Sequence, residues 1–322
     1  MDNLTHTLTG ILLARAGLDR YYRKPALLLA LAANAPDIDI VAASRGSLVY
    51  FHYHRWITHS VLLLPVMAGL AALLVCAMRR SWQGILQAWL LAAIGVASHL
   101  ILDWTNAYGV RLLAPWSDHW YRGDLSSVID PWIWTALLLG VLAPMLGRVV
   151  STEMGARPGS GRVAAFVALG FLTAYDGGRG LLHERALDTL NSRLYADALP
   201  LRVAAFPEAA NPFAWGGVVE TASAYKLYDL NLLDNFDPDE ARVVYKPEVS
   251  PAIQAARATQ TFRWFLPFCE FPLWTVLPAG DAAQPETEVS VREARFGFSA
   301  TALVDAQGRV LKQGFGFGPP RL

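Results

Sequence analysis

Charged residues are scarce in this chain of 322 residues: Asp, Glu, Lys and Arg make up 17% of it, whereas hydrophobic residues make up 54%. That composition is too apolar for an ordinary soluble chain of this length and indicates a membrane protein. A basic excess is also missing, because 27 Lys and Arg balance 27 Asp and Glu. Since a surface that neutralises nucleic-acid phosphates needs such an excess, nucleic acid is not expected as a partner.

Cysteine and the common catalytic motifs are lacking too. The two cysteines, Cys76 and Cys269, are far apart, so neither a disulfide framework nor a thiolate metal site is expected. The HExxH, GxSxG, Walker A and dinucleotide-binding glycine motifs are absent, so the chemistries that they carry find less support. The first residues have no cationic segment before the apolar stretch, so we expect no signal peptide and an N-terminus that stays in the mature protein.

Apolar runs without charge are abundant in the first 180 residues. They occupy residues 61–78, 82–102, 132–146 and, more weakly, 163–175. Because roughly 17–25 helical residues cross a bilayer core, we expect transmembrane helices there. Two earlier segments, 4–18 and 25–41, are short or interrupted by polar residues, and they either cross or lie in the interface as re-entrant helices. The prediction is a mainly α, polytopic membrane helical bundle over residues 1–180.

Basic residues suggest how that bundle is oriented. If all six segments cross, one side of the membrane receives Arg20, Arg23, Lys24, Arg79, Arg80 and the connection 148–162. The positive-inside tendency makes this side cytoplasmic and the membrane the inner one. The opposite, extracytoplasmic side then receives most of the polar segments between the helices.

The chain changes character near residue 181, where apolar runs shorten and alternating patterns begin. Residues 218–230 and 302–313 read as β-hairpins, residues 288–292 alternate with period two, and residues 253–265 fit a helix. We therefore predict a smaller soluble α+β domain over residues 181–322, on the extracytoplasmic side.

Histidine is concentrated in the membrane half, since all but one of the seven lie before residue 120. His6 lies where an apolar helical pattern begins, and His54 and His59 directly precede the apolar run at residue 61. Taken singly, each could be a polar residue of the membrane interface.

Two carboxylates follow Pro36 inside otherwise apolar sequence. Asp37 and Asp39 could simply complement a helix dipole. Ionisable groups in a membrane segment are nevertheless costly without a counter-ion and usually mark function. Because residues at i and i+2 point to different faces, one would bind a metal while the other orients a histidine.

His99 and Asp103 are spaced i and i+4, so they share a helix face at the end of an apolar run. The plain alternative is a hydrogen-bonded pair that only closes the helix end. The case for a metal site is convergence, because the six-crossing topology puts His6, Asp37, Asp39, His54, His59, His99 and Asp103 at one membrane face. Imidazole and carboxylate without thiolate suit Zn²⁺, or else Mn²⁺ or Fe²⁺.

Seven candidate ligands exceed what one tetrahedral ion needs, so one to three divalent ions are expected. Such a site activates water and stabilises charge on a phosphoryl or acyl oxygen. The aromatic loop 104–130 either forms an ordinary interface belt or covers the site. In the second case Arg55, Arg111 or Arg122 would bind an anionic substrate group.

Four motifs in order, MDNLTHTLTG, PDID, HRWITHS and HLILD, resemble the YdjM-type family of membrane-bound metal-dependent hydrolases over residues 1–180. That family is similar, distantly, to zinc-dependent phospholipase C and P1-type nucleases, which implies phosphoester hydrolysis on a helical scaffold. The resemblance implies His6, Asp39, His54, His59, His99 and Asp103 as metal ligands, with Asp37 as a ligand or a group behind one. Further His and Glu ligands of the soluble enzymes find no match here.

The leading hypothesis is a membrane-bound, metal-dependent hydrolase of a phosphoester, with a membrane phospholipid among the expected substrates. Asp37 and Asp103 would orient the attacking water or accept its proton. One rival is a non-catalytic membrane protein that binds a structural or transported ion and uses its C-terminal domain for interactions. In a third interpretation that domain binds a protein partner and the membrane half is only an anchor.

Overall fold

The computed structural model describes residues 1–154, 160–195, 197–281 and 285–318. They form two compact units. The helical unit comprises Met1–Ile40, His54–Leu182 and Pro207–Pro212, and the sheet unit comprises Val41–Tyr53, His183–Phe206 and Phe213–Leu322. The domain boundary at residue 180 stays a prediction. Residues 41–53, which precede that boundary, belong to the sheet unit, and residues 207–212, which follow it, belong to the helical unit.

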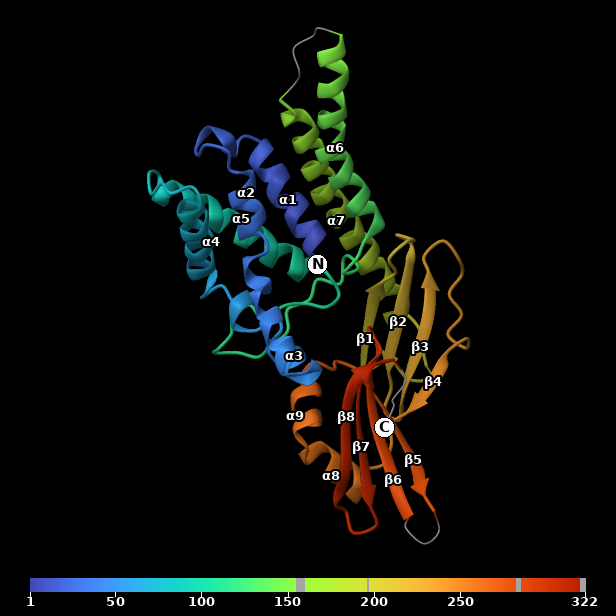
Figure 1. Cartoon of the computed structure of the whole chain (residues 1–322). Coiled ribbons are helices and arrows are strands. Elements are labelled where there is room, and N and C mark those ends of the chain that lie inside the picture. The colour runs from blue at the N-terminus through green and yellow to red at the C-terminus, as the bar shows by residue number, and fades with distance from the viewer. Residues whose placement is uncertain (155–159, 196, 282–284, 319–322) are drawn as a thin grey trace. The chain divides into compact units, whose positions relative to one another are not determined.

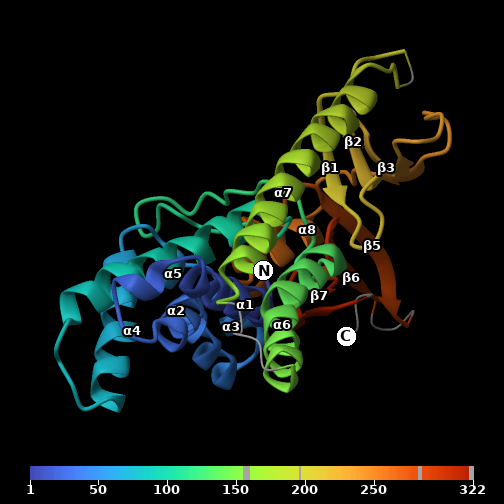
Figure 2. The ribbon, with the colours of Figure 1, turned by 90° about the horizontal axis from the view of Figure 1, so that it is seen from above.

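The helices of the helical unit pack in two groups, with α2, α4 and α5 at one side and α6 at the other (Figures 1 and 2). Its elements are α1 (Asn3–Arg15), η1 (Leu18–Arg20), α2 (Ala26–Ala32), η2 (Ala35–Arg45), η3 (Ile57–His59), α4 (Leu64–Met78), α5 (Ile85–Thr105), α6 (Pro131–Glu153) and α7 (Arg162–Asn191), where η denotes a 3-10 helix. The last residues of η2 and α7 extend into the sheet unit.

Local sequence explains where several of these helices begin. Asp2 caps α1 by accepting hydrogen bonds from the backbone N–H groups of Leu4 and Thr5. The α-helix α2 ends at Ala32, and the chain continues from Ala35, just before Pro36, as the 3-10 helix η2. The first turn of η2 holds Asp37, and Asp39 follows two residues later.

Glycine lets three helices approach closely. A Cβ atom on Gly10 of α1 would lie 2.6 Å from the Leu29 carbonyl oxygen, and one on Gly95 of α5 would lie 2.8 Å from the Ala32 Cβ. Hence α2 is held between α1 and α5, and only glycine fits at both contacts. One apolar core joins α2, α4 and α5 and contains the buried, free Cys76. A second joins α1, α6 and α7.

In the part of the chain that the structure describes, two helices are long and apolar enough to cross a membrane: Ile85–Thr105, with a mean hydropathy of 2.0, and Pro131–Val149, with 1.6. Two bent pairs could each form one more span: Ala26–Ala32 with Ala35–Arg45, and Ser47–His59 with Leu64–Met78, bent by 45° and 90°. The helical membrane region is thus confirmed, with two to four candidate spans.

The expected count of six crossings exceeds what these helices allow. With 13 residues, α1 extends only about 20 Å, which is shorter than the bilayer core. Although α7 has 30 residues, it is not among the candidate spans of the described chain, because charged residues interrupt it.

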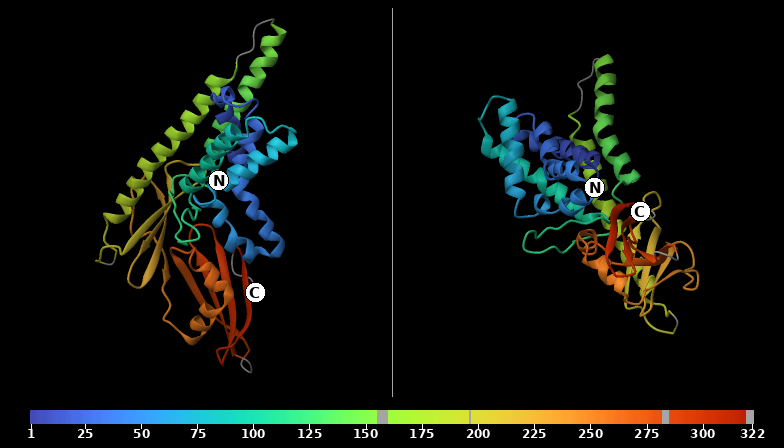
Figure 3. Two further views of the ribbon diagram at one scale, coloured as in Figure 1. Left: turned by 90° about the vertical axis from the view of Figure 1, so that its left-hand side faces the viewer. Right: turned by 60° about the horizontal axis from the view of Figure 1, so that its bottom comes forward.

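The sheet unit contains two antiparallel sheets with strand orders β1-β2-β3-β4 and β5-β6-β7-β8 (Figure 3). The strands are β1 (Arg202–Pro207), β2 (Ala214–Glu220), β3 (Ala224–Asn231), β4 (Arg242–Tyr245), β5 (Pro272–Gly280), β6 (Pro285–Glu293), β7 (Phe298–Asp305) and β8 (Val310–Phe317). Both predicted hairpins and the predicted strand within β6 are confirmed.

Helices complete the sheet unit. The helix expected over residues 253–265 is instead two, α8 (Pro251–Ala258) and α9 (Gln260–Phe265), because Thr259 is extended and caps α9 through its side chain. Both pack on β7. Phe51 of α3 (Ser47–Tyr53) packs among the rings of Phe265, Phe268, Phe298 and Phe315. A smaller α+β unit therefore follows the helical one, as expected.

Candidate metal centre

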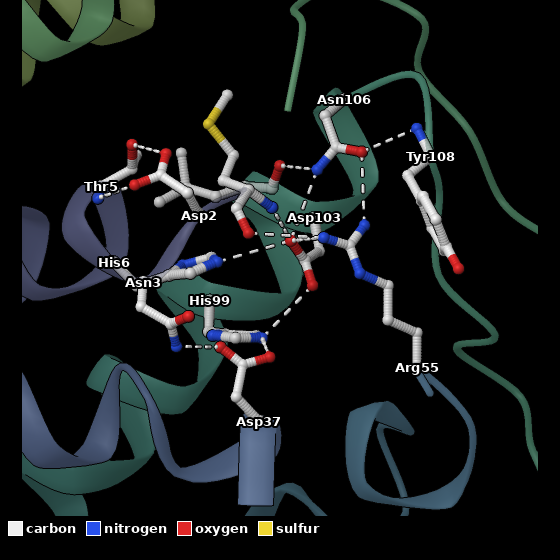
Figure 4. Close-up of polar contacts among 12 residues, drawn as sticks. Asp2, Asn3, Thr5, His6, Asp37, Arg55, His99, Asp103, Asn106 and Tyr108 are labelled. Atoms are coloured by element: carbon white, nitrogen blue, oxygen red, sulfur yellow. Dashed lines mark hydrogen bonds and ion pairs between the residues drawn. The ribbon is translucent and has the colours of Figure 1, made fainter. Parts of the chain in front are cut away.

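Five side chains from four segments of the helical unit converge on one point. His6 comes from α1, Asp37 from η2, His59 from η3, and His99 and Asp103 from α5. Figure 4 shows His6, Asp37, His99 and Asp103 pointing toward one another. All are buried except Asp37, whose side chain is 19% exposed. The convergence expected from the sequence is therefore present in the structure for these five.

Carboxylate and imidazole atoms of the centre face one another at 3.2–3.5 Å. His99 Nε2 lies 3.2 Å and His59 Nε2 3.5 Å from Asp103 Oδ2. His59 Nε2 is also 3.4 Å from Asp37 Oδ1. Asp103 Oδ1 is 3.4 Å from His6 Nε2. Asp103 thus contacts all three imidazoles.

His6 stacks on His99, with ring centroids 3.8 Å apart and planes 22° apart. Burial, and after it the neighbouring His99, lower the pKa of His6 to about 3. The His6 imidazole is therefore neutral at physiological pH, which is the form that binds a metal ion.

The cluster fits a divalent cation because its inward-facing atoms have no other partner. Among the described residues, both nitrogens of His6, Nε2 of His59, Nε2 of His99 and Oδ2 of Asp103 are buried without a hydrogen bond. Buried polar atoms without partners are costly. Two sets, His6 with Asp37 and His99, and His59 with His99 and Asp103, place their ligand atoms within 4.8 Å of one another. Imidazole and carboxylate oxygens suit Zn²⁺.

Surrounding groups hold the imidazoles with Nε2 turned inward. His99 Nδ1 lies 2.7 Å from the Ala33 carbonyl oxygen, to which it donates. His59 Nδ1 lies 3.1 Å from Thr58 Oγ1 and 3.4 Å from Asp39 Oδ2. Partners of this kind fix the tautomer and ring orientation of metal-binding histidines.

Asp39 and His54 lie behind this centre. Both Asp39 oxygens are 3.2 Å from His54 Nδ1, and Asp39 accepts the Arg55 backbone N–H at 2.9 Å. Neither residue belongs to the two candidate ligand sets among the described residues. Their role as ligands stays a prediction, while the geometry gives Asp39 a contact with the rear nitrogen of His59 and Asp37 a contact with the front one.

Arg55 is held inside the site. It is 3% exposed, and its Nη2 lies 2.8 Å from Asp103 Oδ1. Its guanidinium also donates to the Gly109 carbonyl oxygen at 2.9 Å and lies over the Tyr108 ring (Figure 4). Arg55 therefore neutralises Asp103, to which the amino group of Met1 also donates.

The other two arginines predicted to bind substrate lie farther out, on the Trp120 ring. Arg111 donates to the His54 carbonyl oxygen at 3.1 Å, and burial lowers its pKa to about 10, which leaves it cationic at neutral pH. Arg122 donates to the Tyr108 carbonyl oxygen at 3.3 Å. Their role in binding substrate stays a prediction.

Two asparagines were missed by the sequence reasoning. Asn106, fully buried, accepts from Arg55 at 3.3 Å and donates to Asp103 at 3.4 Å. Asn3 donates to Asp37 Oδ2 at 2.7 Å. The signal for Asn106 was its place three residues after Asp103 on α5, where side chains are neighbours. Asn3 carried no comparable signal.

Comparison with known proteins points to one family. Residues 1–181 match the family model described as YdjM inner membrane protein. A curated relative, "Uncharacterized protein YfhP" of Bacillus subtilis (strain 168), is 28% identical over 151 residues. That match covers 44% of this chain and 45% of the relative. No solved structure matches the chain.

Proposed function

Because the chain belongs to the YdjM inner membrane protein family, we propose that it is a membrane-bound, metal-dependent hydrolase of phosphoesters. The observation that carries the proposal is the cluster of partnerless imidazole and carboxylate atoms contributed by His6, His59, His99 and Asp103. The phosphoester class rests on the distant resemblance to zinc-dependent phospholipase C and P1-type nucleases.

His59, His99 and Asp103 would hold one ion, and His6, Asp37 and His99 form an alternative set. Since His99 Nδ1 donates to the Ala33 carbonyl, its Nε2 can serve only one of the two sets at a time. Zinc is the first choice for these ligands, with manganese and iron as alternatives. A divalent ion there would polarise water and neutralise charge that develops on a phosphoryl oxygen.

The two aspartates would have different tasks. Asp37 is the one partly exposed member of the five-residue centre, so it can accept a proton from water and pass it to solvent. Asp103 is buried and paired with Arg55, which keeps it ionised as a ligand and orienting group. A membrane phospholipid entering from the bilayer is the substrate we favour, with Arg111 or Arg122 near its phosphate.

Hydrolysis of bis(p-nitrophenyl) phosphate by the detergent-purified chain tests the proposal. Activity should require added Zn²⁺ or Mn²⁺, stop with a chelator, and vanish in a His59→Ala, His99→Ala double variant. His119→Ala is the matched control, because His119 is exposed and outside the centre. Full activity in the double variant would contradict the hydrolase proposal.

A second candidate function, a structural or transported ion without catalysis, is favoured by the complete burial of His6, His59, His99 and Asp103. A closed site holds four protein ligands, whereas a catalytic site keeps one position for water. Anion binding to the Co²⁺-loaded chain separates them: a visible spectrum that changes with azide shows an open ligand position and favours hydrolysis, whereas an unchanged spectrum favours the closed site.

A further inference from the structure

A polar pocket of about 490 Å³ lies in the helical unit, remote from the metal centre, where α2 and α5 begin and α4 ends. It is lined by the connection before α2, including Arg23 and Lys24, by Arg79 after α4, and by the turn that leads into α5. The 21 residues of α5 extend roughly 30 Å between the pocket and Asp103. The pocket is therefore a separate site, whose role does not depend on the hydrolase proposal.

Side chains fix the shape of this basic pocket. Arg79 Nη1 donates to the Arg23 carbonyl oxygen at 2.8 Å, and Nη2 donates to the Lys24 carbonyl oxygen at 2.6 Å. The Arg79 guanidinium lies 5.0 Å from the centre of the Tyr22 ring. A Cβ on Gly84 would lie 3.6 Å from the same ring. The three segments are thus tied together around the pocket.

The basic pocket carries positive charge without a counter-ion. No carboxylate lines it, and no ion pair in the described part of the chain involves Arg23, Lys24 or Arg79. The nearby Asp19 is paired with Arg162 at 3.1 Å. Gly84 caps α5 without a side-chain hydrogen bond, so the first N–H groups of α5 add partial positive charge there.

Exposed apolar side chains surround the basic pocket. Leu27, Met78, Trp82 and Leu86 are between 44% and 63% exposed. They belong to, or flank, the candidate spans, and tryptophan beside basic residues is typical of the membrane interface. An anion reaching this pocket would therefore have apolar surface beside it for acyl chains.

We propose that the basic pocket binds the phosphate of an anionic phospholipid headgroup, whose acyl chains lie on the exposed apolar side chains of α4 and α5. Basic pockets between transmembrane helices at the cytoplasmic face suit such headgroups. Arg23 and Lys24 supply mobile cations, and Arg79 supplies a fixed one.

Native mass spectrometry of the full chain in detergent, titrated with dioleoyl phosphatidylglycerol or dioleoyl phosphatidylcholine, tests this. Phosphatidylglycerol should bind at least about tenfold more tightly than phosphatidylcholine, since each basic residue contributes roughly fivefold near an anionic headgroup. Arg23→Gln with Lys24→Gln should abolish most of that preference, and Arg23→Gln alone should weaken binding roughly fivefold. Arg193→Gln with Arg242→Gln, two exposed charges of the sheet unit, should change nothing.

Three results would overturn the proposal: equal binding of both lipids, unchanged phosphatidylglycerol binding in Arg23→Gln, or displacement of the lipid by millimolar inorganic phosphate. The last would make the pocket a site for a free anion. Among the described residues, Arg23 and Lys24 have no ion-pair partner, and both side chains are exposed, so unchanged thermal unfolding of the variants serves as the folding control.

Discussion

Each imidazole of the His59–His99 pair uses its two nitrogens differently. Nδ1 contacts a fixed protein oxygen, from Asp39 or from the Ala33 carbonyl, and Nε2 faces the centre without a hydrogen bond. This division is what a metal-binding histidine requires, because its rear partner sets the tautomer. The residue behind each histidine should therefore matter nearly as much as the histidine itself.

Asp39→Asn should lower the zinc affinity of the purified chain about 10–100-fold, because His59 loses the carboxylate behind Nδ1. Competition with a chromophoric chelator measures the change. Asp118→Asn is the matched control, since that carboxylate is 72% exposed. An affinity equal to wild type in Asp39→Asn would mean that Asp39 does not orient His59.

The sequence predicted the candidate ligands, but it did not predict all the residues that hydrogen-bond to those ligands or pair with them. Spacing and topology brought His6, His59, His99 and Asp103 to one face, because each lies at a helix end. The i and i+2 spacing also predicted that Asp37 and Asp39 point to different faces, and in the structure Asp37 contacts the front nitrogen of His59 and Asp39 the rear one. Arg55 was expected at a substrate, yet its buried pairing with Asp103 depends on a loop conformation that no periodicity specifies.

At the scale of elements, contact between α2 and α5 sets the position of His99. Gly95 lies one turn before His99 on α5, and its backbone rests on Ala32 of α2. The neighbouring Ala33 carbonyl accepts the His99 hydrogen bond. Any side chain at Gly95 would separate the helices and lengthen that bond.

Gly95→Ala should destabilise the protein by about 1–3 kcal/mol through overpacking and weaken metal binding. Gly69→Ala in α4 is the matched control, because a Cβ there meets nothing closer than 3.8 Å; it should be neutral or slightly stabilising. Thermal unfolding and zinc titration measure both effects. Equal behaviour of the two variants would contradict the close α2–α5 contact.

Asp176 of α7 introduces a pH dependence outside the candidate spans. Burial, and after it the charge of Asp130, raise the pKa of Asp176 to about 6. The folded state therefore holds this proton more tightly than the unfolded state, so the contribution of Asp176 to stability falls as pH rises from about 4 to about 6.

The unfolding temperature of Asp176→Asn should therefore rise relative to that of wild type as the pH increases from about 4 to about 6. Above pH 6 the difference between the two unfolding temperatures should stay constant. Thermal scans of both proteins from pH 4 to 8 measure the difference. Asp188→Asn, an exposed aspartate of the same helix, is the matched control. A constant offset for Asp176→Asn would show that its pKa is not raised.

Element boundaries were predicted well where one local rule acts alone. The hairpins of β2–β3 and β7–β8 follow from alternation. The apolar run at residue 61 begins its helix three residues late, because Ser60 and Val61 hydrogen-bond in a turn, the latter to the Leu112 carbonyl oxygen at 3.0 Å. Such long-range partners are not visible in a local pattern.

Across the whole molecule, the metal centre and the basic pocket lie at opposite ends of α5. The positive-inside tendency predicts that the basic pocket faces the cytoplasm and the metal centre the other side, and this orientation stays a prediction. Hydropathy overestimated the number of crossings because it does not distinguish apolar residues that contact lipid from apolar residues that pack in a protein core. The short helix α1 is apolar because it packs in the core with α6 and α7.

Cysteine labelling in intact cells should bear out this orientation. In a background with Cys76→Ala and Cys269→Ser, Trp116→Cys should react with an impermeant maleimide, since Trp116 is 74% exposed in the loop after α5. Trp82→Cys, at the opposite end of α5, should react only after permeabilisation. The reverse pattern would place the metal centre in the cytoplasm.

The most direct test of the central claim is the metal content of the detergent-purified chain by mass spectrometry, in wild type, His99→Ala and the control His119→Ala. We predict about one or more zinc or manganese ions per chain in wild type and control, and none in His99→Ala. No bound metal in wild type, even after reconstitution with divalent ions, would contradict the metal centre and with it the proposed hydrolase.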